Sequence, residues 1–104
     1  MVYFVEHIQA QGERQRKIPL PKKFWKHFPL NSIVKIELLE DHSLYYVDKV
    51  QAQGKLQRRI PVPLKFWEEF PIGALVRVEL MRTPIISIQK NKIENKNQKV
   101  IKND

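Results

Sequence analysis

The sequence contains no cysteine, only three glycines and no long apolar run, and each scarcity argues against a class of protein. Without cysteine the chain can form neither a disulfide framework nor a thiolate zinc site, which fits the reducing cytoplasm. No stretch of about 18 consecutive apolar residues is available to span a membrane. The first residues also lack the basic leader and the cleavage site of a secretory signal. We therefore expect a cytoplasmic protein that does not contact membranes.

Signatures of catalysis and metal binding are equally scarce. The three histidines, His7, His27 and His42, are not spaced like metal ligands, and solvated surface positions are the simpler interpretation. The sequence has no nucleophile-elbow motif G-x-S-x-G and no glycine-rich phosphate loop. Glu68 and Glu69 occupy adjacent helix positions that diverge in direction, so they are not expected to act together as acid and base. We predict that the protein is not an enzyme and uses no cofactor.

The dominant feature of the sequence is an internal repeat. Residues 2–40 (the first repeat) and 44–82 (the second repeat) align without a gap at an offset of 42 residues and are identical at 19 of 39 positions. We interpret this as an internal duplication. A unit of about 40 residues rarely folds alone without disulfides or metal, so the two repeats should share a core or pair with another chain.

The residue pattern predicts the same elements in each repeat. Runs of β-branched and aromatic residues predict first strands, a glycine in each turn predicts hairpins, and paired prolines should end the second strands and open helices of about two turns. The predicted first strands are 2–9 and 44–51, the returning strands 15–20 and 57–62, the helices 22–28 and 64–70, and the last strands 33–38 and 75–80.

Two further segments complete the predicted organisation. A short strand near 84–89 would end a single domain spanning 1–89, and the polar, lysine-rich residues 90–104 would form a mobile basic tail. The fold class is therefore predicted as mainly β with short helices (α+β), with pseudo-two-fold symmetry. The helix aromatics recur at helical spacing, which favours core packing over a stacking platform for single-stranded nucleic acid. These aromatics are Phe24, Trp25, Phe28, Phe66, Trp67 and Phe70.

The segment Arg59-x-x-x-Pro63, a seven-residue helix, Ile72 and a strand at 76–80 together resemble the AbrB/MazE/SpoVT type of swapped-hairpin β-barrel. The resemblance covers roughly residues 5–40 and 47–82. It implies two copies that interleave their hairpins into one barrel, usually from two chains. Because this chain carries both copies, as in the MraZ type, we expect a single-chain pseudo-dimer or a homo-oligomer.

Positive charge is the main clue to function. The formal net charge is +8, divided as +2 in residues 1–42, +3 in 43–82 and +3 in 83–104. Such an excess commonly serves a polyanion, although it also serves solubility. The lysine and arginine residues near the hairpins and helices are expected to form two patches on one face, and these patches are expected to contact double-stranded DNA. The candidate DNA-binding residues are Arg14, Arg16, Lys17, Lys23, Lys26, Lys55, Arg58, Arg59 and Lys65.

The family resemblance implies a narrower set of contacts. Lys17 and Arg59 match the basic residue that contacts DNA in the family, four residues before the proline that opens the helix. Lys26 matches one of the family's helix arginines. The resulting hypothesis is a small nucleoid-associated DNA-binding protein, either a transcriptional regulator or a chromatin-like architectural factor. The alternative is an antitoxin or another interaction module whose tail wraps a toxin or other protein partner. The net basic tail, with few apolar anchors, disfavours that alternative.

Overall fold

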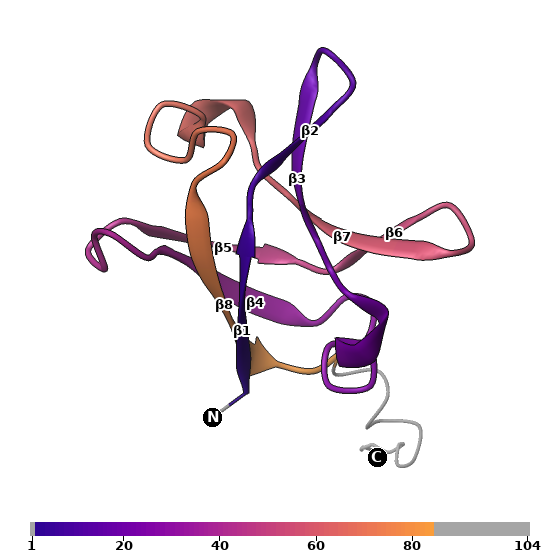
Figure 1. Ribbon diagram of the computed structural model, residues 1–104. Coiled ribbons are helices and arrows are strands. Elements are labelled where there is room, and N and C mark those ends of the chain that lie inside the picture. Colours follow the sequence, from indigo (N-terminus) through magenta and orange to yellow (C-terminus); the bar gives the residue numbers. More distant parts are fainter. Residues whose placement is uncertain (1, 85–104) are drawn as a thin grey trace, which may run out of the picture.

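The computed structural model describes residues 2–84 and shows a mainly β fold with two four-stranded antiparallel sheets (Figure 1). Sheet A has the strand order β1 (Tyr3–His7), β8 (Leu75–Arg82), β4 (Ile33–Leu38) and β5 (Tyr45–Lys49). Sheet B has the order β2 (Gln9–Gln11), β3 (Gln15–Pro19), β7 (Gln57–Pro61) and β6 (Gln51–Gln53). Within residues 2–84 the ladders do not close into one barrel. The strand predicted near 84–89, beyond Pro84, and the predicted tail 90–104 lie outside the described residues.

Strand pairing joins the two repeats in both sheets. Each element has a counterpart 42 residues later, yet β1 pairs with β8, β4 pairs with both β5 and β8, and β3 pairs with β7. In the ladder between β4 and β8, Ile36 lies opposite Val78, and both side chains are buried. Neither repeat therefore completes a sheet by itself.

The strands predicted at 2–9 and 44–51 are each divided in two, which corrects the sequence interpretation. At Ile8 and Val50, both buried, the chain leaves sheet A and enters sheet B. The backbone groups of these corner residues bond to the loop that precedes the last strand of a repeat, so the corners leave no orphaned polar group. The bonds run from Ile8 N to Ala74 O (3.0 Å), Gly73 N to Ile8 O (2.8 Å), Val50 N to Ser32 O (3.0 Å) and Asn31 N to Val50 O (2.8 Å).

The prediction of two-turn helices at 22–28 and 64–70 is wrong. The structure has only the 3-10 helices η1 (Lys22–Phe24) and η2 (Leu64–Phe66), each followed by turn residues. Pro29 and Pro71 follow closely, and proline disfavours helical geometry at the residue before it, so few α-type hydrogen bonds can form. Short helical segments commonly tighten in this way. The fold is accordingly mainly β with almost no helix.

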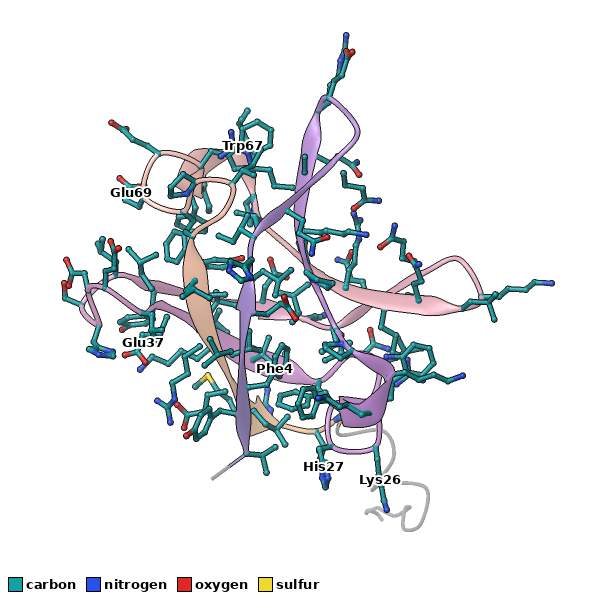
Figure 2. The ribbon with its side chains drawn as sticks, in the orientation of Figure 1. Phe4, Lys26, His27, Glu37, Trp67 and Glu69 are labelled. Atoms are coloured by element: carbon teal, nitrogen blue, oxygen red, sulfur yellow. The ribbon has the colours of Figure 1, made fainter. Side chains whose placement is uncertain are left out.

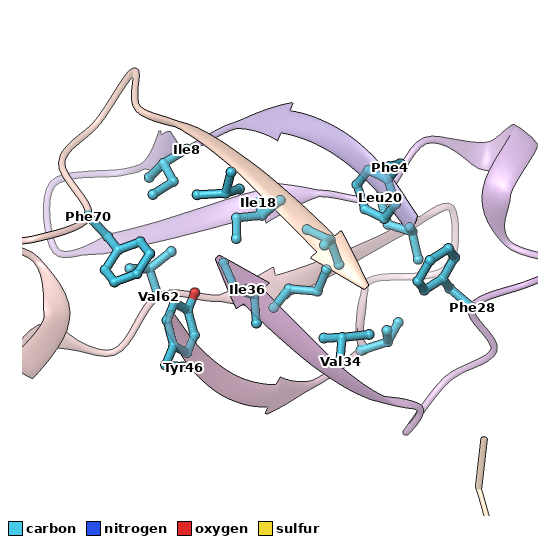
Figure 3. Close-up of a cluster of buried hydrophobic side chains, with 14 residues drawn as sticks. Phe4, Ile8, Ile18, Leu20, Phe28, Val34, Ile36, Tyr46, Val62 and Phe70 are labelled. Atoms are coloured by element: carbon cyan, nitrogen blue, oxygen red, sulfur yellow. The ribbon is translucent and has the colours of Figure 1, made fainter. Parts of the chain in front are cut away.

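One cluster of buried apolar side chains lies between the sheets and draws on both repeats (Figure 3). Phe28 and Phe70, from the turns after η1 and η2, are almost fully buried. Each ring meets an aromatic ring of sheet A edge-on, with centroid distances of 5.1 Å for Phe4–Phe28 and 5.1 Å for Tyr46–Phe70. Such geometry adds to the stabilisation from burial alone.

Core packing, predicted for all six helix aromatics, holds for Phe28 and Phe70, whereas Phe24, Trp25, Phe66 and Trp67 are only partly buried. Trp25 and Trp67 are partly buried and pack against the edge of the cluster. Their indole nitrogens donate hydrogen bonds to the backbone oxygens of Leu20 (3.0 Å) and Val62 (2.8 Å). One side of each ring is therefore available to another side chain.

Tyr46→Phe should remove part of the loss of stability at alkaline pH. The Tyr46 hydroxyl donates to the backbone oxygen of Pro61 at 2.9 Å, and burial raises the pKa of Tyr46 above its usual value. Above about pH 10 the unfolded chain releases this proton while the folded chain keeps it, so the free energy of unfolding falls by up to about 1.4 kcal/mol per pH unit. Phe4, the counterpart in the first repeat, shows that phenylalanine fits this position.

Urea unfolding between about pH 8 and pH 11 measures this difference. At neutral pH the variant should lose only about 1 kcal/mol, the usual net value of one hydrogen bond. Parallel pH profiles for the parent and the variant would contradict the assignment.

Candidate nucleic-acid interface

Sheet B presents one side to the core and the other to solvent. Ile18 and Ile60 lie opposite each other on β3 and β7, and both are fully buried. Side chains alternate between faces along a strand, so the flanking residues Lys17 and Arg59 point to the outer face. Lys17 pairs with Pro61, and Arg59 pairs with Pro19. Lys17 and Arg59 are thus close diagonal neighbours at the centre of the sheet.

All six glutamines of the two hairpins share this outer face. The register places Gln9 opposite Lys17, Gln11 opposite Gln15, Gln51 opposite Arg59 and Gln53 opposite Gln57. Residues paired in an antiparallel ladder point to the same side. We call this surface the glutamine face. It consists of Gln9, Gln11, Gln15, Lys17, Gln51, Gln53, Gln57 and Arg59.

Hydrogen bonds to the glutamines hold the side chains of Lys17 and Arg59 in place. The Lys17 ammonium donates to Gln53 Oε1 at 3.2 Å, which links the two hairpins. The Arg59 guanidinium donates to Gln11 Oε1, to Gln15 Oε1 at 3.3 Å and to Gln51 Oε1 at 3.4 Å. Both cationic side chains are only partly exposed. Their neutral partners fix their positions without cancelling their charge.

The neighbouring arginines have a different environment. Arg16 and Arg58 lie on the core side of β3 and β7, where each guanidinium stacks on a tryptophan of the other repeat. Arg16 lies 4.1 Å from the Trp67 ring centroid, and Arg58 lies 4.3 Å from that of Trp25. Arg16 Nη1 also donates to the backbone oxygen of Trp67 at 3.3 Å. These stacked pairs join the repeats, and cation–π contacts of this kind are modestly stabilising.

The other predicted site residues are spread over the molecule. Arg14 and Lys55 lie in the exposed turns of the two hairpins, which diverge from the crossing of β3 and β7 (Figure 1). Lys23 and Lys65 lie over the rings of Phe24 (5.3 Å) and Phe66 (5.2 Å) in η1 and η2.

Lys26 follows η1 and lies at the opposite end of the molecule from Trp67 (Figure 2). The expectation that all nine candidate DNA-binding residues lie on one face is therefore wrong. Alternation along the strands separates Lys17 from Arg16, and η1 and η2 lie at opposite ends.

A groove runs beside the glutamine face. It has a volume of about 300 Å³ and passes between the second hairpin and the chain around η1. Lys17, Gln53 and Gln57 line it together with the apolar side chains of Trp25 and Leu56. The groove thus combines cationic and amide groups with an aromatic wall.

The outer face of sheet A contrasts with the glutamine face because it carries acidic residues that pair with Arg77. Arg77 lies 3.5 Å from Glu37 and 3.5 Å from Glu79, and Glu37 also lies 3.4 Å from His42. Glu37 is only 8% exposed, so this group of ion pairs is partly buried. Lys17 and Arg59, by comparison, have no acidic residue among the members of the glutamine face.

The glutamines were missed in the sequence analysis, although a signal was present. The pattern Q-x-Q precedes each turn, and a further glutamine follows each turn. On a two-stranded hairpin these spacings place all of them on one side.

Three further observations are not specific to the glutamine face. Within residues 2–84 no group of three or more His, Cys, Asp or Glu side chains could hold a metal ion. Over the same range, no helix is long and apolar enough to cross a membrane. Comparison of the chain with protein-family models, with curated proteins and with solved structures finds no match.

Proposed function

We propose that the chain is a small protein that binds duplex DNA through the glutamine face, as a transcriptional regulator or an architectural factor. The observation that carries the proposal is the position of Lys17 and Arg59. They lie side by side at the centre of an exposed sheet surface that holds six glutamines and no acid. Among the predicted site residues, this pair has the strongest structural support.

The chemistry of this face suits both parts of DNA recognition. Lysine and arginine neutralise phosphates with release of counterions. Glutamine can form two hydrogen bonds to adenine, and arginine can form two to guanine, at the edges exposed in the major groove. That groove admits a two-stranded β-ribbon, and the hairpins β2–β3 and β6–β7 are ribbons of this kind. Arg14 and Lys55 at their tips would add phosphate contacts.

We further infer that the fold is a single-chain form of the swapped-hairpin arrangement of the AbrB/MazE/SpoVT type. Support comes from the exchange of elements between repeats: β1 pairs with β8, and the hairpins cross through the pairing of β3 with β7. Lys17 and Arg59 are two of the three positions that the family resemblance assigns to DNA contact, and the third, Lys26, lies outside the glutamine face.

A titration of labelled duplex DNA at several salt concentrations tests the function. The parent should bind, and the logarithm of its affinity should fall linearly with the logarithm of salt concentration between about 50 and 200 mM. In Lys17→Ala with Arg59→Ala, the loss of two phosphate contacts should flatten that slope by about 1.8. If either side chain contacts a base, an additional loss of about 1–3 kcal/mol should appear on the preferred sequence only.

Two control variants make the result specific to this face. Arg16→Ala with Arg58→Ala removes the same charge but acts on the tryptophan side, so it should lower thermal stability and alter the salt slope less. Lys35→Ala changes a base on sheet A, which lies over the Tyr45 ring, and should bind like the parent. Absence of salt-dependent binding by the parent, or parent-like binding by the Lys17/Arg59 variant, would refute the proposal.

A further inference from the structure

The two ends of the molecule are built from corresponding segments of the two repeats and carry opposite charge. One end is formed by the turn after η2, the link between β4 and β5, and the start of β8. The other is formed by the turn after η1 and the end of β8, at counterpart positions 42 residues earlier or later. Figure 2 shows Glu69 near the first end, and Lys26 and His27 near the second. We call them the acidic end and the basic end.

The acidic end contains a groove of about 550 Å³ with an apolar floor. Leu38, Leu39 and Leu75 line the floor, and Leu39 N donates to Leu75 O at 3.0 Å, which ties the β4–β5 link to β8. Leu75 is 40% exposed and its neighbour Ile72 is 52% exposed. Such an exposed apolar surface, bordered by charge, has the composition of a contact site.

Three glutamates, Glu40, Glu68 and Glu69, line the same groove, and all are exposed. In the other repeat each of these three positions holds a basic residue. The counterparts of Glu40, Glu68 and Glu69 are Arg82, Lys26 and His27, which are also exposed. Lys26 and Arg82 contribute the formal positive charge at these positions.

The basic end also has exposed apolar residues. Leu30 and Met81, the counterparts of Ile72 and Leu39, are 37% and 56% exposed at the basic end. The repeats therefore differ at these positions by reversal of charge, while the apolar positions stay apolar and are exposed or partly exposed in both repeats. This divergence makes the two ends complementary to each other.

We propose that the acidic end of one molecule binds the basic end of a second copy of this chain. Contact between two like ends would oppose charges of the same sign, so the favoured contact is head to tail. A head-to-tail contact leaves one free end on each molecule, and assembly continues into a ring or an open filament. The partner is a second copy because the surface that matches the groove in charge and in apolar content is on the chain itself.

Two opposing electrostatic effects depend on the salt concentration. The acidic end of one molecule attracts the basic end of another, whereas the two molecules repel each other because each has a net charge of +8. At about 0.1 M salt the screening length is about 10 Å, which weakens long-range repulsion more than contacts between paired charges. At about 1 M salt it is about 3 Å, and the paired charges are screened as well. Association should therefore be visible at the lower salt concentration and decline at the higher one.

Sedimentation velocity of the full chain without DNA tests the proposal through two triple variants. The basic-ended variant carries Glu40→Arg, Glu68→Lys and Glu69→His, and the acid-ended variant carries Lys26→Glu, His27→Glu and Arg82→Glu. The weight-average mass of the parent should rise with concentration at about 0.1 M salt. Each variant alone should remain monomeric, and an equimolar mixture of the two should associate.

All six substituted positions are exposed, and unchanged thermal unfolding of each variant would show that the fold is intact. Arg14→Glu with Lys55→Glu, which reverses charges at the hairpin tips, should associate at least as well as the parent. A parent that stays monomeric up to about 1 mM would overturn the proposal. So would a variant that associates alone like the parent, or a mixture that does not associate. Because no DNA is present, the outcome is independent of the proposed DNA binding.

Discussion

Residues 1–42 and residues 43–104, prepared as separate fragments, should each fail to form a stable folded monomer. In the first fragment β1 and β4 lose β8, β4 also loses β5, and β3 loses β7. What remains of the described ladders is the short β2–β3 hairpin, and an isolated hairpin is marginal in water. The expected effect is loss of the whole folding free energy, typically about 5–15 kcal/mol for a domain.

Circular dichroism and urea unfolding of the fragments measure this effect. Each fragment alone should be unfolded or should form a homodimer in which a second copy replaces the missing strands. The chain break lies in the exposed link between β4 and β5, so an equimolar mixture of the fragments should recover the spectrum of the intact protein. A fragment that unfolds cooperatively as a monomer would contradict the requirement for both repeats.

Phe28→Ala and Phe70→Ala should be the most destabilising single substitutions in the turns that follow η1 and η2. Each ring is almost fully buried between the sheets and contacts an aromatic ring of sheet A. Truncating a buried phenylalanine costs about 3–5 kcal/mol, because apolar burial is lost and a cavity remains. The midpoint of urea unfolding should fall accordingly, with the m-value unchanged.

Trp25→Ala and Trp67→Ala are the matched comparison within the same turns. Each indole is larger than a phenyl ring but only partly buried, and it contributes one hydrogen bond and one arginine contact. We expect a loss of about 2 kcal/mol for each, less than for the phenylalanines. If the tryptophan variants were the less stable pair, the assignment of core and edge would be reversed.

Much of the local structure follows from short-range pattern. The alternation of apolar and polar residues predicts β4 at 33–38, and the structure has β4 at Ile33–Leu38. The glycine turns likewise predict hairpins that the structure shows as β2–β3 and β6–β7. These predictions succeed because the face of a strand and the position of a turn depend on residues that are adjacent in sequence.

The candidate site could be predicted only in part. The sequence analysis selected Lys17 and Arg59 together with Arg16 and Arg58, since all four are basic and lie in one segment of each repeat. Strand alternation sends Arg16 and Arg58 to the tryptophans and leaves Lys17 and Arg59 among the glutamines. Which side is covered depends on packing against the other repeat, and no local pattern reports that packing.

The sequence by itself determined that the chain consists of two similar units of strands and turns with an excess of positive charge. Only the tertiary structure decided that the first strand of each repeat divides at Ile8 or Val50 and passes between sheets, and that β1 pairs with β8. It also decided that the reversed charges lie at opposite ends. The physical reason is that these features depend on contacts between residues far apart in sequence. Burial of one shared core selects those contacts, and local propensity does not encode them.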